Sequence, residues 1–247
     1  MSNAPDSPAF HIISTVKEVP IFIFGDHASR HIPTQYDNLG LNGDDLTRHI
    51  AWDIGTETVI RELCAYFGCG GQLAGVSRLV IDLNRDPAAA GLIPAESDGT
   101  LIPANAVSEA ERQDRMAQFY TPYHAALGQN LDRLTTPFVL SIHSFTPQPK
   151  TGAARPTDIG LLMRHDEASA KAFQKLYRAV NPNFNVDINL PYSAYDLNYT
   201  VDEHIAPRGL RHLAIEIRQD HIDTDAKARA IAKTLTGVIE QIINAKD

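Results

Sequence analysis

Short runs of continuous apolar residues recur along the chain, and each gives way abruptly to polar or small residues. The clearest runs are residues 21–24 and the start of the segment 138–145. Runs of this length, rich in Val, Ile, Leu and Phe, are typical of strands buried on both faces of a sheet. Similar patterns predict further strands in residues 77–87, 159–163 and 213–218.

Helical spacing of apolar residues alternates with these strands. It predicts helices over residues 44–67, 109–134 and 168–180, and a last helix that begins at Thr224. The first would end at Gly68, and in it His49 and Asp53, four residues apart, would share one face. The second would begin in a capping box at Ser108 and be interrupted near Pro122.

Three segments lack either pattern. Residues 1–19 read as a loose lead-in, residues 88–105 as a long loop, and residues 183–204 as a loop whose Tyr and Asn side chains suit the rim of a polar pocket. Strands that alternate with helices indicate an α/β domain with helices on both sides of a sheet. Because no linker rich in Gly, Ser or Pro divides the chain, we expect a single domain over residues 1–247.

Composition narrows the class of protein. Of the 247 residues, 43% are hydrophobic and 21% are charged, as in a globular protein. The net charge of −8 opposes binding to nucleic acid or to an anionic membrane. Cys64 and Cys69 are too few for a cysteine-rich zinc site or a disulfide scaffold. Neither a leader pattern nor an apolar run of membrane-spanning length occurs, so we expect a cytoplasmic location.

Two of the predicted buried strands lead directly into a histidine. His143 lies at the end of the apolar part of the segment 138–145, and His27 follows residues 21–24 after one glycine and one aspartate. Open α/β sheets place their ligands at the carboxyl ends of their strands. A lone histidine there is more often an ordinary polar residue, but the repetition favours a metal site at the strand ends.

Several acidic residues are candidates to complete this site. Asp53 could be a carboxylate ligand, with Glu57 as its competitor, or it could simply interact with the positive end of a helix dipole. Glu216 stands inside an apolar strand, where an unpaired carboxylate is costly to bury. It therefore either forms a salt bridge with Arg78 or Arg218, or serves as a general base.

Arg78 and Arg85 flank the apolar part of residues 77–87, and Asn84 precedes Arg85. Solvated arginines usually carry no specific role. Near a metal site, a planar guanidinium can hold a substrate carboxylate through two hydrogen bonds or face a developing oxyanion.

Taken together, five motifs resemble the N-formylglutamate amidohydrolase family across nearly the whole chain. They are His27, HIAWD from His49, SRLVIDLNR from Ser77, SIHSF from Ser141 and IEIRQD from Ile215. That family is related in fold to zinc carboxypeptidases and aspartoacylases. The resemblance implies a phosphorylase/hydrolase-like three-layer α/β/α domain, with a mixed, mostly parallel central sheet and one zinc ion at the strand ends.

The resemblance also implies roles for individual residues. The implied metal ligands are His27, Asp53 and His143. The implied catalytic residues are Glu216 and Arg78, of which Arg78 would face the carbonyl oxygen. The implied substrate-binding residues are Asn84, Arg85 and Ser144, of which the first two would hold a carboxylate. Carboxypeptidases take two ligands from one His-x-x-Glu, but here Arg30 replaces that Glu, so Asp53 is the best match for the acidic ligand.

Two imidazoles and one carboxylate leave one position of a tetrahedral zinc ion open for water, as in catalytic sites. Another divalent first-row metal is compatible with these ligands. We hypothesise that the protein hydrolyses N-formyl-L-glutamate or a similar N-acyl amino acid with a metal-activated water, and that Glu216 transfers the proton.

Two alternatives stay open at this point. One is a zinc peptidase or an N-acetylmuramoyl-L-alanine amidase-like hydrolase, and the other is a non-catalytic protein that binds a carboxylate metabolite. For the favoured hydrolase, the expected partner is a small-molecule N-acyl amino acid substrate, and neither nucleic acid nor membrane is expected. The sequence does not determine the acyl group or the amino acid of the substrate, the identity of the metal or the oligomeric state.

Overall fold

The computed structural model describes residues 7–17 and 19–245, which form nine strands and five α-helices. The strands are β1 Phe10–Ile13, β2 Ile21–Gly25, β3 Gly70–Ala74, β4 Glu96–Ser97, β5 Thr100–Leu101, β6 Phe138–Phe145, β7 Ile159–Leu162, β8 Val186–Ile188 and β9 His212–Arg218. The α-helices are α1 Thr56–Phe67, α2 Glu109–Arg115, α3 Thr121–Asp132, α4 Glu167–Val180 and α5 Asp225–Asn244. The two π-helical turns are η5 Met116–Tyr120 and η6 Val201–Ile205. The 3-10 segments are η1 Thr34–Gly40, η2 Asp45–Thr47, η3 Ala90–Leu92, η4 Pro103–Asn105, η7 Ala206–Arg208 and η8 Gln219–His221.

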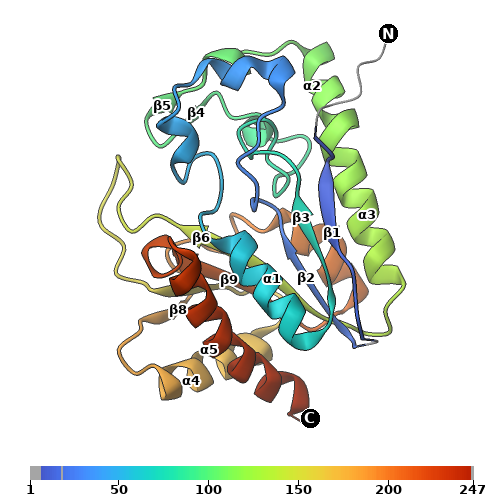
Figure 1. Cartoon of the computed structure of the whole chain (residues 1–247), viewed down its shortest axis with the longest axis vertical. Coiled ribbons are helices and arrows are strands. Elements are labelled where there is room, and N and C mark those ends of the chain that lie inside the picture. The colour runs from blue at the N-terminus through green and yellow to red at the C-terminus, as the bar shows by residue number, and fades with distance from the viewer. Residues whose placement is uncertain (1–6, 18, 246–247) are drawn as a thin grey trace.

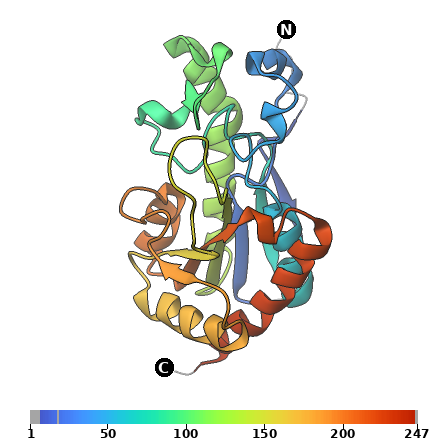
Figure 2. The same cartoon turned by 90° about the vertical axis from the view of Figure 1, so that its left-hand side faces the viewer.

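Seven of these strands form one mixed sheet in the order β1-β3-β2-β6-β9-β7-β8. β2 is parallel to both β3 and β6, β6 is parallel to β9, and β7 is parallel to β8. Only β1 with β3 and β7 with β9 pair antiparallel among the described strands of this sheet. Helices cover both of its faces, with α1, α4 and α5 on one and α3 on the other (Figure 1 and Figure 2). The predicted α/β class with a mixed, mostly parallel sheet between helices is therefore confirmed.

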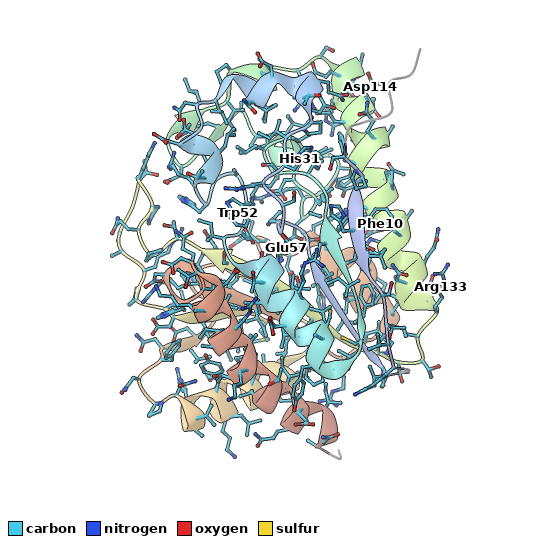
Figure 3. The ribbon with its side chains drawn as sticks, viewed as in Figure 1. Phe10, His31, Trp52, Glu57, Asp114 and Arg133 are labelled. Carbon is cyan, nitrogen blue, oxygen red and sulfur yellow. The ribbon has the colours of Figure 1, made fainter. Side chains whose placement is uncertain are left out.

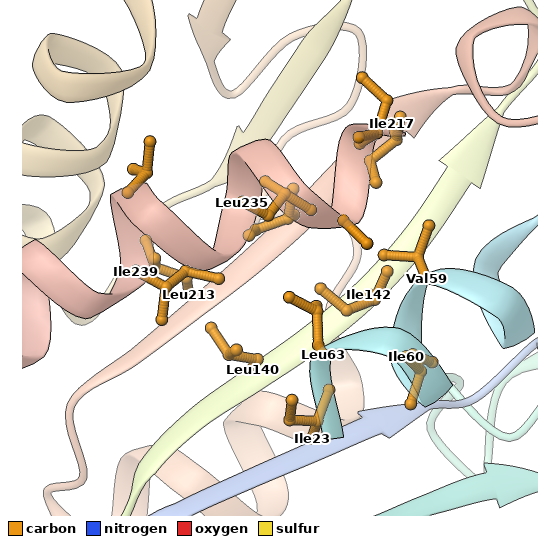
Figure 4. Close-up of a cluster of buried hydrophobic side chains, with 14 of the residues drawn as sticks. Ile23, Val59, Ile60, Leu63, Leu140, Ile142, Leu213, Ile217, Leu235 and Ile239 are labelled. Atoms are coloured by element: carbon orange, nitrogen blue, oxygen red, sulfur yellow. The ribbon is translucent and has the colours of Figure 1, made fainter. Parts of the chain in front are cut away.

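Side chains of the central strands alternate between two apolar layers, which explains the continuous apolar runs. Ile23 of β2 packs in the layer beneath α1, α4 and α5, whereas its neighbour Phe24 packs in the layer that contains η5 and α3. In the first layer, Leu63 of α1, Leu235 of α5 and Leu140 of β6 belong to one apolar cluster (Figure 4). Because each such side chain contributes roughly 1.5–3 kcal/mol when fully buried, these layers fix the sheet rigidly beneath its carboxyl edge.

The helix predicted over residues 44–67 is shorter in the structure. α1 begins at Thr56, and the residues before it form turns, so the prediction that His49 and Asp53 share a helix face is wrong. The break occurs at Gly55, whose φ of 82° lies in the left-handed region that favours glycine. A Cβ at this position would collide with the backbone carbonyl of Ile222, so the chain also needs glycine here for space.

The prediction of a strand within residues 77–87 is also wrong, because this segment forms turns and does not pair with the sheet. Leu79 and Val80 are fully buried, so the apolar pattern reported burial correctly. Their carbonyl oxygens accept hydrogen bonds from side chains, at 2.8 Å from Asn105 Nδ2 and 3.0 Å from Arg115 Nη1. Arg115 is itself buried and donates to Asn105 Oδ1 at 2.9 Å. Two polar side chains thus satisfy backbone groups that a sheet neighbour would otherwise pair.

Smaller departures concern the segments predicted as loops. The lead-in contains β1, which pairs with β3 at the edge of the sheet, while residues 1–6 and 18 lie outside the described part of the chain. The loop 88–105 contains the β4–β5 hairpin, and the loop 183–204 contains β8. The interruption predicted near Pro122 takes the form of η5, with Pro122 in the first turn of α3. None of the helices in the described part of the chain combines the length and apolarity needed to cross a bilayer.

Candidate metal-binding active site

Two histidines and a glutamate meet because β2, β6 and β9 are parallel neighbours whose carboxyl ends lie at one edge of the sheet. His27 follows β2 by two residues. His143 lies near the end of β6, and Glu216 of β9 is its direct register partner. All three side chains are buried, so the sheet itself places three groups that carry chemistry at one point.

Asp53 joins these groups from the turn that precedes α1. Its backbone N–H donates to the carbonyl oxygen of His27 at 2.9 Å, which holds the turn against the end of β2. Its Oδ2 atom lies 3.0 Å from His143 Nδ1 and 3.5 Å from His27 Nδ1. The same oxygen accepts the backbone N–H of Ser144 at 3.2 Å. Asp53 is therefore held by its neighbours in a position between the two rings.

The geometry of these three residues fits a divalent cation. His27, Asp53 and His143 each offer one ligand atom, and these atoms lie within 4.8 Å of one another. His27 Nδ1 is buried without a hydrogen-bond partner, a costly arrangement for a polar atom unless something else occupies the space beside it. Imidazole nitrogen and carboxylate oxygen suit Zn²⁺ and other divalent first-row metals, so the donor set does not identify the metal.

A carboxylate lies near the Nε2 atom of each of the two imidazoles, on the side away from Asp53. His27 Nε2 lies 2.7 Å from Asp82 Oδ1, and His143 Nε2 lies 3.5 Å from Asp26 Oδ2 and 3.0 Å from Ser141 Oγ. Partners of this kind fix the orientation and tautomer of a metal-binding histidine and leave its other nitrogen free for the metal. Sequence reasoning gave neither Asp26 nor Asp82 this role.

Electrostatics around the rings favour positive charge. Burial and Arg78 act to lower the pKa of His27, but Asp82 and Asp53 raise it above its ordinary value. Burial acts in the same way on His143, and again the neighbouring carboxylates win and raise its pKa well above that value. For Asp53, burial acts to raise the pKa, yet His27, His143 and Arg78 hold it far below its ordinary range. Protonated imidazole rings would supply this positive charge, and a bound cation would supply it equally well.

Glu216 stands beside the cluster without belonging to it. Burial raises the pKa of its carboxyl to about 7, although His143 acts in the opposite direction. Its Oε2 atom is buried without a hydrogen-bond partner. The salt-bridge alternative for Glu216 is wrong, because Arg78 and Arg218 both pair with aspartates instead. A carboxyl with a pKa near neutral can both take up and release a proton at neutral pH.

A cavity of about 130 Å³ opens above these groups. The residues predicted for the site all line it, namely His27, Asp53, Arg78, Asn84, Arg85, His143, Ser144 and Glu216. Its remaining walls are His49, Phe145, Leu162, Tyr192 and Leu197. The structure thus brings together in one cavity residues that are spread over most of the sequence.

Arg78 is oriented by two carboxylates. Its Nη2 atom donates to Asp82 Oδ2 at 2.8 Å, and its Nη1 atom donates to Asp53 Oδ1 at 3.3 Å. Arg85 Nε lies 3.7 Å from the same oxygen of Asp82. Asp82 therefore contacts His27 and both arginines, and it fixes the positions of these three side chains relative to one another.

Asn84 and Ser144 are held by backbone groups. The side-chain oxygen of Asn84 accepts the backbone N–H of Thr200 at 2.9 Å, which leaves its NH₂ group available to donate. Ser144 Oγ donates to the carbonyl oxygen of Ile54 at 2.9 Å, so its hydroxyl ties β6 to the turn that carries Asp53.

Glu57, the competing carboxylate, lies outside the cluster. It projects from the first turn of α1 (Figure 3), pairs with Arg61 at 2.8 Å and lines a separate surface groove next to Trp52. The carboxylate that approaches both histidines is that of Asp53.

Comparisons with known proteins identify the family of the chain. Residues 19–222 match the model of a family described as N-formylglutamate amidohydrolase. The structure is similar to that of the gene product Atu2144 from Agrobacterium tumefaciens, with 32% sequence identity, a TM-score of 0.91 and coverage of 96% of this chain and 95% of that one. It also shares its fold with N-formylglutamate amidohydrolase from Ralstonia eutropha JMP134, with 22% identity, a TM-score of 0.71 and coverage of 97% of both chains. No curated protein matches the chain in sequence.

Proposed function

The chain belongs to the N-formylglutamate amidohydrolase family, and from this premise we propose that it hydrolyses the amide bond of N-formyl-L-glutamate or of a similar N-acyl amino acid. The observation that carries the proposal is the convergence of ligand atoms from His27, Asp53 and His143, with Glu216 on the neighbouring strand. A general acid–base beside a metal site with room for water has the composition of an amide hydrolase.

The proposed cofactor is one Zn²⁺ ion held by His27, Asp53 and His143. When bound, such an ion lowers the pKa of a water molecule and polarises the carbonyl of the substrate. Asp82 and Asp26 contact the other nitrogen of each ring, and these contacts would fix the orientation of the two histidines around such an ion.

Glu216 transfers the proton in this proposal. Its carboxylate accepts a proton from the attacking water as the new C–O bond forms. The resulting carboxylic acid returns that proton to the amide nitrogen as the C–N bond breaks, which releases the acid and the free amine. A pKa of about 7 suits both halves of this cycle, because neither protonation state is strongly disfavoured at neutral pH.

Arg78 is proposed to stabilise the developing oxyanion. Asp53 and Asp82 already fix its guanidinium, so its dipoles are oriented before the reaction begins. Arg85 and the NH₂ group of Asn84 are proposed to hold a carboxylate of the substrate, with Ser144 at the same wall of the cavity.

The test is formate release from N-formyl-L-glutamate by the metal-loaded protein, before and after removal of the metal with a chelator. We expect activity to disappear with the metal and to return when Zn²⁺ is added back, with one ion per chain by elemental analysis. Peptides and an N-acetylmuramoyl-L-alanine substrate are assayed in parallel. Activity that survives complete metal removal, or activity on those substrates alone, would contradict the proposal.

A further inference from the structure

A second cavity of about 270 Å³ adjoins the first. His49, Arg78 and Tyr192 line both cavities, so the two are neighbours that share one wall. The second cavity adds Arg155, from the loop that follows β6, and Asp98, from the β4–β5 hairpin. A molecule seated over the metal cluster could therefore extend past Tyr192 towards Arg155.

Arg155 carries a positive charge that no carboxylate in the described part of the chain pairs with. Its Nη1 atom donates to two neutral oxygens, the hydroxyl of Tyr192 at 2.9 Å and the carbonyl of Thr146 at 3.3 Å. The guanidinium also lies over the ring of Tyr192, at 4.8 Å from its centroid, and 5.8 Å from that of Phe145. These contacts hold the group in place without neutralising it, unlike Arg78, which two aspartates neutralise.

Tyr192 offers a second donor at the same place. Its oxygen accepts from Arg155, so its own O–H hydrogen is available to another acceptor. Burial and the nearby Glu216 carboxyl raise the pKa of Tyr192, so the hydroxyl keeps that hydrogen at neutral pH. An arginine and a phenol that point at one space form a suitable site for a carboxylate.

The one acidic group of this cavity, among the residues that the structure describes, is already compensated. Asp98 pairs with Arg48 and His49, each at 3.2 Å, and accepts the backbone N–H groups of Lys150 and Thr151. It therefore does not oppose an anion strongly.

We propose that Arg155, assisted by the Tyr192 hydroxyl, is a specificity-determining residue that receives a second carboxylate, the one on the side chain of the substrate. Arg85 and Asn84 hold the first carboxylate, and the amide lies between the two. This inference rests on the proposed amidohydrolase function.

The test compares N-formyl-L-glutamate with N-formyl-L-glutamine, in which a neutral carboxamide of the same shape replaces the side-chain carboxylate. A charge-assisted hydrogen bond predicts that the metal-loaded protein prefers the acid in kcat/KM by roughly 10- to 100-fold. Arg155→Met removes this preference, because it lowers kcat/KM for the acid far more than for the amide, which carries no charge to pair with the guanidinium. Arg155→Lys restores part of the preference, because it keeps the charge but not the planar fork.

The matched control is Arg164→Met. Arg164 also lies over a tyrosine ring, at 5.6 Å from that of Tyr195, but it lines neither cavity, so the preference stays intact in this variant. A preference that persists in Arg155→Met, or an equal loss for both substrates, would overturn the proposal.

Calorimetric binding of the same two ligands separates this proposal from the proposed function. If no N-formyl amino acid is hydrolysed, the amidohydrolase proposal fails. Tighter binding of the acid that disappears in Arg155→Met still supports the carboxylate site. Equal binding of the acid and the amide by the unmodified protein overturns it.

Discussion

His143 and Glu216 are register partners on the adjacent parallel strands β6 and β9. The sheet therefore holds an imidazole of the candidate metal cluster and a buried carboxyl side by side, without help from any loop. Partners on neighbouring strands project from the same face of a sheet, so neither group can turn away from the other without a shift of register. This rigidity supports the proposed division of roles, in which the three-residue cluster holds the metal and the Glu216 carboxyl transfers the proton.

Replacing Glu216 with Gln should remove the proton carrier but not the cation. We expect Glu216→Gln to retain its metal content, because Glu216 is outside the set of three ligand residues, while kcat falls roughly 10²- to 10⁴-fold. Formate release and elemental analysis measure the two effects. Glu203→Gln, a change at an exposed position of η6, serves as the control and leaves both unchanged. Turnover near the original rate would remove Glu216 from the mechanism.

Replacing Asp82 with Asn should weaken metal binding, because Asp82 holds the ring nitrogen of His27 that does not face the metal site. Asp82 contacts His27 Nε2 at 2.7 Å, so its loss frees the ring to reorient and makes the imidazole a poorer donor. We expect the metal affinity to fall roughly 10- to 100-fold, measured by competition with a chromogenic chelator. Asp114→Asn on the exposed side of α2 provides the comparison. Equal affinity in the two variants would show that Asp82 does not support the ligand.

The contact between buried His124 and half-buried His204 should make the fold sensitive to acid. The rings stack with centroids 5.1 Å apart, and His124 Nδ1 lies 2.8 Å from His204 Nε2. His124 Nε2 donates to the carbonyl of Leu83 at 3.0 Å, so the neutral ring uses Nδ1 as an acceptor. Burial lowers the pKa of His124 from its ordinary value of 6.5 to about 4, which keeps the ring uncharged in the folded state.

Between pH 6.5 and about pH 4, the pKa values of His124 in the unfolded and folded states, the unfolded chain binds a proton at His124 that the folded protein does not. Stability therefore falls on acidification, by up to about 1.4 kcal/mol per pH unit from this residue. Urea unfolding between about pH 7.5 and pH 5 measures the slope, which we expect to be shallower in His124→Gln than in the original protein. His11→Gln, an exposed change on β1, should keep the original slope. An unchanged slope in His124→Gln would contradict this account.

Gly160 of β7 should tolerate no side chain. It is the antiparallel register partner of Glu216, and a Cβ there would collide with the carbonyl oxygen of Leu190. We expect Gly160→Ala to lose roughly 1–3 kcal/mol of stability through overpacking. Activity should fall as well, because relief of the collision displaces the segment that leads to Tyr192. Urea unfolding and formate release measure the two effects.

Gly237 offers the opposite case within the same chain. It lies inside α5, and a Cβ there meets no atom within 4 Å. Gly237→Ala should therefore stabilise the protein by roughly 0.5–1 kcal/mol and leave activity unchanged, because alanine is the better helix former. If Gly160→Ala proves as benign as Gly237→Ala, the space argument at β7 is wrong.

The central strands could be predicted from sequence because both of their faces are buried. A strand covered on two sides gives an unbroken apolar run, as at Ile21–Gly25 and Phe138–Phe145. Strand order and direction leave no such trace, so the antiparallel pairing of β7 with β9 was not predicted. The strand β3 escaped prediction because GGQLA is short and rich in glycine.

The segment 77–87 shows the limit of the same reasoning. An apolar pattern reports burial, not sheet pairing, and here Asn105 and Arg115 satisfy the buried carbonyls. Nothing in the local sequence reveals those distant partners. The overlong helix over residues 44–67 has a different cause, since Gly55 inside the pattern was a visible stop signal that the apolar spacing outweighed.

The residues of the candidate site were predictable where a polar side chain interrupts or ends an apolar run. His27, His143 and Glu216 stand out because each is polar at the end of an apolar run or inside one. Asp26 and Asp82 do not stand out, since their contacts with the rings arise only when distant segments meet. Asp26 did carry one signal, because it is an acidic residue that directly follows the apolar strand β2 and precedes His27.

Arg115 supports the cavity although it lies far along the chain from the cavity residues. It is 1% exposed and belongs to α2, yet it anchors the turn that presents Arg78 and Asp82. A random mutagenesis screen for inactive variants would therefore recover changes at Arg115 together with changes in the pocket itself. Attempts to redesign substrate preference therefore have to preserve Arg115. Without it, the turn that carries Arg78 and Asp82 would shift, and the effect of a change in the cavity could not be separated from that shift.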